Sequence, residues 1–173
     1  MSFSTTHQIK KSEDVDLACE SARRLINYRP RSESELRIRL NKKYSNDVVN
    51  ECITKMYCED FLNDKRFAQM YTDSRINSRH RSASTIRREL SVKGISKDIS
   101  LTVTSEINDY EQALKVAQKK SRSLSTLPKD KFFQKMLSHL YRRGFNYTIS
   151  KETTVIAWSQ IQELQCNPSS DNT

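Results

Sequence analysis

The sequence predicts an all-α protein built from three similar three-helix units in tandem. Only two Gly and three Pro occur among its 173 residues, too few for the tight turns that hairpins and sheets need. Hydrophobic residues make up 35% of the chain, so a core must be thin or divided among small units. One helix pattern also returns every fifty residues, and repeats of that length are typical of helical arrays.

The fifty-residue register is clearest in the second helix of each unit. An apolar residue recurs there at one position and a leucine recurs four residues later: Leu36, Ile86 and Met136, then Leu40, Leu90 and Leu140. Upstream, Leu17-Ala18 aligns with Phe67-Ala68, and Val116-Ala117 follows with a slip of one residue. Because one small unit buries little by itself, neighbouring units are expected to stack.

Capping signals place the helices of the first unit. The first helix carries apolar residues from Val15 to Leu25. Ser32 and Glu35 have the spacing of a capping box, in which hydroxyl and carboxylate each satisfy a backbone N–H group. A third helix is expected after Asn46, a good N-cap residue.

The later units repeat this arrangement. Gly94 and Gly144 lie where a helix can end in a left-handed residue, whereas Tyr44 fits that role poorly, so the first unit is expected to close differently. Ser96 and Asn146 align with Asn46 as starts of the third helices.

Connections between the helices are short. The stretch FLND, Phe61 to Asp64, joins the first two units, and its Asn63 or Asp64 can cap the next helix. SRSLSTLP, beginning at Ser121, is expected to be a looser connection inside the third unit. The predicted parts are an N-terminal extension (1–14), repeat 1 with its linker (15–64), repeat 2 (65–110), repeat 3 (111–164) and a flexible tail (165–173).

The N-terminus lacks the apolar run of a secretory signal. No window approaches the roughly 18 apolar residues of a membrane span, so a cytoplasmic protein without membrane contact is expected. The cysteines show no C-x-x-C spacing and are expected to be buried, reduced thiols; they are Cys19, Cys52, Cys58 and Cys166.

The formal charge of +9 favours a polyanion, or a protein that wraps one, as the partner. Arg31, Arg81 and Lys131 recur fifty residues apart, and the first two precede an expected helix start. A cation is mildly unfavourable there, whereas an anion-binding design would use it. A second trio, at positions 43, 93 and 143, suits a helix C-terminus for folding reasons alone.

The second helices are the most basic element of each unit. The candidate partner-binding or nucleic-acid-binding residues are therefore Arg31, Arg37, Arg81, Arg87, Arg88, Lys93, Lys131, Lys135, Arg142 and Arg143. No phosphate-binding loop, dinucleotide motif or H-E-x-x-H motif is present. Because His7, His80 and His139 lie far apart in sequence and in unlike contexts, they are not expected to bind metal. An enzyme is the least expected class, and no cofactor is expected.

Two stretches, FLNDKRFA (61–68) and IRRELSVKGI (86–95), resemble the RecX family of recombinase regulators. The resemblance rests on a leucine followed by amide and acidic residues, a Phe-Ala pair, and glutamate-leucine before lysine-glycine-isoleucine. Ser32 with Glu35-Leu36 matches an earlier part of the pattern, and RRGF, Arg142 to Phe145, resembles the motif of the third unit. The likeness covers roughly residues 15–160.

The resemblance implies a curved rod of three three-helix units, in a cytosolic bacterial protein without a catalytic site. It implies binding to the RecA recombinase, along the groove of its nucleoprotein filament, with inhibition of strand exchange and ATPase activity. A monomer is expected, with weak direct DNA binding as a secondary property. Members often carry Gly near Asp60, His80 and Ser82, so the shape of the connection here is expected to differ.

Two other classes of function remain open. A helical module could bind nucleic acid directly through its basic helices, although no unit has a recognition helix rich in Asn, Gln and Arg together. An adaptor for another acidic protein is the third class.

Overall fold

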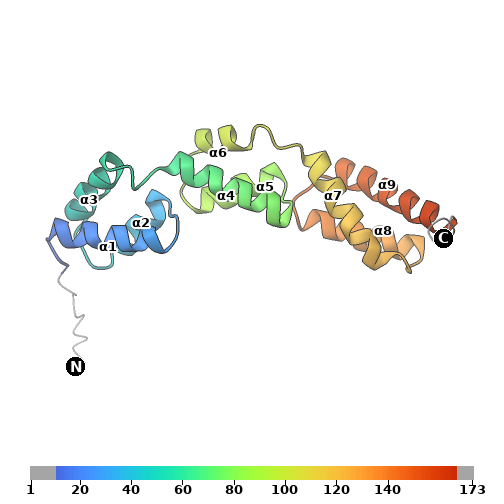
Figure 1. The fold of residues 1–173 in the computed structure, drawn as a ribbon, viewed down its shortest axis with the longest axis horizontal. Helices are drawn as coiled ribbons and strands as arrows, with labels where there is room; N and C mark the ends of the chain where they lie inside the picture. The colour runs from blue at the N-terminus through green and yellow to red at the C-terminus, as the bar shows by residue number, and fades with distance from the viewer. Residues whose placement is uncertain (1–10, 167–173) are drawn as a thin grey trace, which may run out of the picture.

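The computed structural model describes residues 11–166, which form nine α-helices and one turn of 3-10 helix, without a β-sheet. The helices follow one another along an elongated, curved rod (Figure 1). Helices α1–α3 lie at one end, α4–α6 in the middle and α7–α9 at the other end. The predicted all-α fold of three three-helix repeats is confirmed.

The helix bounds follow the repeats. Repeat 1 contains α1 (Val15–Tyr28), α2 (Glu33–Leu40) and α3 (Asn46–Cys58). Repeat 2 contains α4 (Asp64–Arg79), α5 (Ala83–Val92) and α6 (Lys97–Thr104). Repeat 3 contains α7 (Asp109–Ser121), α8 (Lys129–Tyr141) and α9 (Tyr147–Cys166), with the 3-10 turn Arg122–Leu124 between α7 and α8. Helix α9 continues through the first two residues of the predicted tail, and 167–173 lie outside the described residues.

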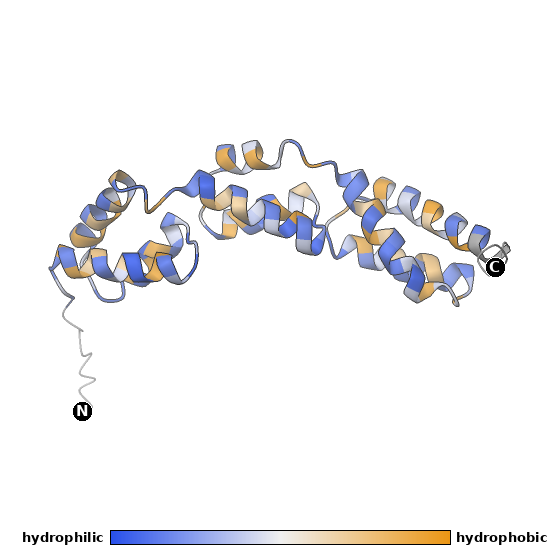
Figure 2. Ribbon diagram, in the orientation of Figure 1, coloured by the Kyte–Doolittle hydropathy of each residue, from blue (hydrophilic) through white to orange (hydrophobic). Residues whose placement is uncertain are grey.

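Each repeat has an apolar core of its own. The residues that define the fifty-residue register are all fully or almost fully buried: Leu36, Leu40, Ile86, Leu90, Met136 and Leu140. Figure 2 shows apolar residues spread over the three repeats rather than gathered at one centre. The register therefore reflects packing within each repeat.

Side-chain caps begin most of these helices. Ser32, Ser82 and Ser96 each accept a hydrogen bond from the backbone N–H three residues on. Only half of the predicted capping box forms, because the Glu35 carboxylate binds Arg29 and Lys93 instead of the Ser32 N–H.

The predicted cap at Asn46 is wrong, since Ser45 is the N-cap residue of α3 and Asn46 is its first helical residue. Asn63 is the cap of α4, accepting a hydrogen bond from the Arg66 N–H. At the start of α9, Asn146 accepts from the Ile149 N–H, as predicted.

The predicted left-handed glycines are confirmed, with φ of 77° at Gly94 and 89° at Gly144. Tyr44 closes repeat 1 differently. Its side chain is buried, its hydroxyl donates to the Leu17 carbonyl, and its neighbour Ser45 donates its backbone N–H to the Ser12 carbonyl.

Two other residues also adopt left-handed backbone. Asp60 has φ of 54° and His80 has φ of 46°, and both residue types tolerate this region better than most. These are two of the positions at which the resemblance led us to expect a different chain path. The third, Ser82, is the N-cap of α5.

The thiols follow the prediction in part. Cys19 and Cys52 are buried and free, whereas Cys58 is exposed, because it is the last residue of α3 and faces solvent. Burial, together with a hydrogen bond to Cys19, raises the pKa of Cys52 to about 12, so this thiol stays protonated. Nothing is described for the side chain of Cys166. Among residues 11–166, no helix is both long enough and apolar enough to cross a membrane.

Candidate partner-binding surfaces

The N-terminus of α2 is fixed against the next repeat. Ser32 Oγ donates to the Lys93 carbonyl over 2.6 Å, and the Asp64 carboxylate accepts from the Glu33 N–H over 2.8 Å. A Cβ atom on Gly94 would overlap the side chain of Ser34. Gly94 is therefore required for close packing as well as for its backbone conformation.

The N-terminus of α5 is held in the same way by repeat 3. The Ser82 N–H donates to the Arg143 carbonyl over 3.1 Å, and the Asp109 carboxylate accepts from the Ala83 N–H over 2.7 Å. A Cβ on Gly144 would overlap the Thr85 hydroxyl. A carboxylate thus already occupies the positive end of each helix dipole. The N-termini of α2 and α5 consequently do not offer an open site for an external anion.

The cations that precede these helices have internal partners. Arg31 is 9% exposed, and its Nε donates to the Leu25 carbonyl over 3.0 Å. Burial and the nearby Arg29 lower its pKa. Arg81 donates to the Arg142 carbonyl over 2.7 Å. The expectation that folding alone would not favour cations at these two positions is therefore wrong.

Four other candidates also make internal contacts. Arg37 pairs with Glu33 over 2.6 Å, and Arg87 donates to Thr104 Oγ1 over 3.0 Å. Lys93 pairs with Glu35 over 2.8 Å and so links repeats 1 and 2. Burial acts to raise the pKa of Glu35, but hydrogen bonds from Arg29 and Lys93 lower it to about 2. The fourth, Arg143, contacts His139 Nδ1 over 3.3 Å.

The remaining four candidates have exposed side chains: Arg88, Lys131, Lys135 and Arg142. The first lies on α5, and the others lie on α8 or directly after it. The structure brings Arg81, Arg142 and Arg143 together where repeats 2 and 3 meet, but it does not gather the ten candidates into one site.

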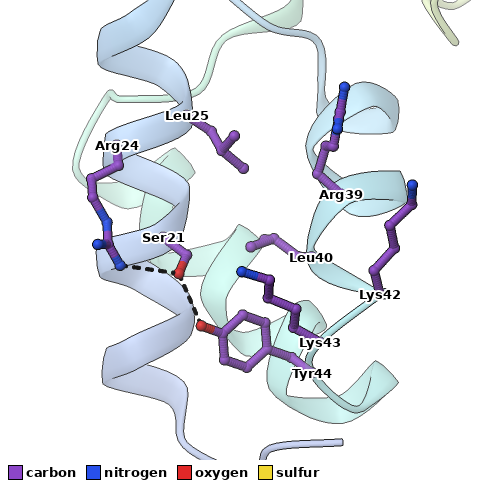
Figure 3. A pocket seen from close by; sticks show the side chains of 8 residues that line it. All are labelled: Ser21, Arg24, Leu25, Arg39, Leu40, Lys42, Lys43 and Tyr44. Carbon is purple, nitrogen blue, oxygen red and sulfur yellow. Dashed lines mark hydrogen bonds between the residues drawn. The ribbon is translucent and has the colours of Figure 1, made fainter. Parts of the chain in front are cut away.

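A groove between α1 and α2 contains basic residues that the sequence prediction did not include. It has a volume of about 370 Å³ and is lined by Ser21, Arg24, Leu25, Arg39, Leu40, Lys42, Lys43 and Tyr44. Four of these residues are cations and none is a carboxylate. Figure 3 shows Lys43 reaching between the two helices, with Leu25 and Leu40 beside it and Arg24 directed toward Ser21.

A second basic groove, of about 270 Å³, lies where repeats 2 and 3 meet. It is lined by Ser78, Arg79, His80, Val116, Lys119, Lys120, His139 and Arg143. Burial and the neighbouring Arg143, Lys120 and Arg142 lower the pKa of His139 to about 4. The imidazole is therefore neutral near pH 7 and can accept a hydrogen bond from Arg143. The buried Nε of Arg143 has no hydrogen-bond partner.

Both grooves could have been found by reading one further position of the register. Positions 39, 89 and 139 carry Arg, Glu and His. An acid therefore occurs at this position in repeat 2 only. Lys43, which lines the first groove, was assigned in the sequence to a helix-terminal role alone, whereas Arg143, which lines the second, was among the ten candidates.

Comparison with known proteins matches the repeats one by one. Models of the first, second and third three-helix domains of RecX match residues 18–56, 63–100 and 107–152. Together the three matches cover well over half of the chain, in the order of the repeats. The chain belongs to the RecX family.

Several RecX relatives are named "Regulatory protein RecX". The protein of Listeria monocytogenes serovar 1/2a is 30% identical over 158 residues, which cover 89% of this chain and 59% of the relative. That of Bacillus velezensis is 32% identical and that of Clostridium perfringens 33%, covering 82% and 78% of this chain and 56% and 66% of the relatives. The chain thus spans about three fifths of the length of these relatives.

Two solved RecX structures share the fold. RecX from Lactobacillus salivarius has a TM-score of 0.71 and 24% identity, covering 88% of this chain and 97% of that one. A second RecX structure also has a TM-score of 0.71, with 21% identity and coverage of 82% and 73%. At these identities the likeness supports the fold alone.

Proposed function

We propose that this protein regulates a RecA-type recombinase in the bacterial cytosol by binding the assembled nucleoprotein filament. Binding inhibits strand exchange and the ATPase activity of the recombinase. Membership of the RecX family and the regulatory names of the relatives support this proposal.

The single observation that carries the proposal is the rod of three repeats, joined by hydrogen bonds at both junctions. A filament presents the same surface at regular intervals along its axis. A rod with a fixed order of surfaces can contact several of its subunits, and simultaneous weak contacts add avidity when the geometry allows them.

The exposed cations are the proposed contact residues. The residues Arg88, Lys131, Lys135 and Arg142 are exposed, whereas the other six candidates are partly or fully buried. Because exposed charges are screened by salt, binding should weaken as the ionic strength rises.

The test measures ATPase activity of a RecA-type recombinase on single-stranded DNA. Wild type should suppress the activity, and Arg88→Glu/Lys135→Glu should suppress it less while keeping its helical content. Lys97→Glu/Lys115→Glu is the matched control, because it makes the same change in charge at exposed positions on α6 and α7. Absence of suppression by wild type would contradict the proposal. Full suppression by the first double variant would exclude only Arg88 and Lys135 as contacts.

The net charge of +9 favours direct binding to nucleic acid as the second candidate function. Binding to bare single-stranded DNA is therefore measured alongside the ATPase. Tight binding to bare DNA without an effect on the recombinase would favour this second function.

A further inference from the structure

The groove between first and second helices can be compared at the same position in all three repeats. In the fifty-residue register, Arg39, Glu89 and His139 each directly precede a buried leucine. The three residues therefore occupy equivalent positions on α2, α5 and α8. Only the middle repeat carries a carboxylate at this position.

In repeat 2 that carboxylate lies between α4 and α5. Glu89 Oε2 accepts from Arg75 Nε over 2.7 Å and from the Tyr71 hydroxyl over 2.8 Å. Arg81 Nε lies 3.9 Å from the other carboxylate oxygen. Burial acts to raise the pKa of Glu89, but the hydrogen bonds from Arg75 and Tyr71 hold it below the ordinary value. Repeat 2 thus demonstrates that this groove accommodates a carboxylate among cationic and hydroxyl donors.

Repeat 1 retains the groove without the carboxylate. In the same register, Ser21 stands in place of Tyr71, and Arg39 stands in place of Glu89. The smaller Ser21 leaves the groove open, with about 370 Å³ of space and four cations along it. Leu25 stands in place of Arg75, so in repeat 1 the positive charge beside the open space comes from Arg24, Arg39, Lys42 and Lys43 instead.

Repeat 3 lacks the carboxylate as well. His139 stands in place of Glu89, and Arg143 and Lys120 line the groove beside it. Arg79, Lys119, Lys120 and Arg143 give this groove four cations and no carboxylate, as in repeat 1.

We propose that the grooves of repeats 1 and 3 bind carboxylates from an acidic segment of a partner protein, at the position that Glu89 fills in repeat 2. A protein carboxylate is favoured over a phosphate because repeat 2 already binds a carboxylate at this position. The apolar side chains of Leu25 and Leu40 in the first groove also fit an apolar residue next to the acid in the partner. Charge-assisted hydrogen bonds from arginine suit a carboxylate acceptor.

The test uses the full chain and a fluorescein-labelled, acetylated octapeptide of alternating leucine and glutamate, followed by fluorescence anisotropy at low salt. Arg39→Glu gives repeat 1 a carboxylate of its own, and His139→Glu does the same in repeat 3. Each change should weaken peptide binding. The two together should raise the dissociation constant at least about tenfold, because the loss of a single charge-assisted hydrogen bond already has an effect of this size. The inference does not rest on the proposed function, because it is argued from the grooves themselves and its test contains no recombinase.

Each groove variant has a control that makes the same change in charge at an exposed position outside the grooves. Lys97→Glu on α6 matches Arg39→Glu, and Gln134→Glu on α8 matches His139→Glu; both sites are exposed, and both variants should bind as wild type does. Arg39 is exposed as well, so Arg39→Glu should fold even if His139→Glu does not. Helical content measured by circular dichroism checks both.

Three outcomes would overturn the proposal. One is unchanged peptide binding by both groove variants. Another is equal binding of a peptide with glutamine in place of glutamate, which would make the grooves apolar sites. The third is that wild type does not bind the peptide but binds a ten-nucleotide thymidine oligonucleotide, and that the groove variants lose this binding. That result would assign the grooves to phosphate.

Discussion

Repeat 2 buries five apolar residues in its core, whereas repeat 1 buries twelve and repeat 3 buries ten. Repeat 2 adds a polar cluster in which Glu89 binds Arg75 and Tyr71. It is also the one repeat of the described chain with a junction on both sides. In tandem repeats, the interface between neighbours contributes stability that one repeat lacks alone. The comparison teaches that the middle repeat depends on its neighbours more than the outer repeats do.

The largest expected effect comes from the small core of repeat 2. Leu90 is 0% exposed, so Leu90→Ala should lower the free energy of unfolding by about 2–5 kcal/mol. Because repeat 2 connects the outer repeats, the variant should also separate their unfolding into two transitions. Urea denaturation checks both expectations, with Leu40→Ala in repeat 1 for comparison. An unchanged midpoint for Leu90→Ala would contradict the core assignment.

Changes at the junction glycines should have effects of similar size. Gly144→Ala introduces a Cβ at positive φ, which costs about 1–2 kcal/mol, and it overlaps the Thr85 hydroxyl, for which overpacking adds about 1–3 kcal/mol. Gly94→Ala should act similarly against Ser34. Ser34→Gly should recover part of that second loss, and a double-mutant cycle in urea measures the coupling. Additive losses would indicate that Gly94 and Ser34 do not pack together.

A smaller effect should separate the partly buried ion pair from an exposed one. Glu89→Gln weakens the contacts to Arg75 and Tyr71 and should cost about 1 kcal/mol. Glu59→Gln removes the charge from the exposed pair with Arg23 and should cost clearly less than Glu89→Gln, because solvent screens an exposed pair. Thermal unfolding of the two variants at pH 7 gives the comparison. Equal losses would show that Glu89 is no more important than an exposed glutamate.

The last prediction concerns pH. The pKa of His139 falls from its ordinary 6.5 to about 4 in the folded chain. Between these pH values the unfolded state binds more protons, so stability decreases as the pH is lowered from about 7 toward 4. Glu35, with its pKa lowered to about 2, contributes only below its ordinary pKa of 4.5. His139→Gln should therefore reduce the loss of stability between pH 7 and pH 5. An identical loss in wild type and variant would exclude His139 as its source.

Most of the fold was predictable because its signals are local or periodic. The buried leucines at positions 40, 90 and 140 express packing within one repeat, and Gly94 and Gly144 express a backbone requirement. The contacts between repeats were not predictable in the same way. Ser32 and Lys93 are 61 positions apart in the chain, and no periodicity within one repeat indicates that they meet.

The candidate site was predicted less well for the same reason. The partners of Arg31 and Arg81 are backbone carbonyls, which leave no mark in the sequence. A charge count cannot tell a cation that satisfies a carbonyl from one that faces solvent. The basic grooves depend on which residues α1 or α7 place opposite the second helix, and only the difference at positions 39, 89 and 139 signals them.

Hydrogen exchange of the backbone amides in native conditions tests most directly whether the junctions make the three repeats one rigid rod. In wild type, the slowest amides of α5 should exchange with about the same free energy as those of α2 and α8, because repeat 2 opens only when its neighbours release it. Gly144→Ala should lower protection in α5 as well as in α8. Slowest amides in α5 that exchange much faster than those of the outer repeats, and that are unaffected by Gly144→Ala, would contradict the account.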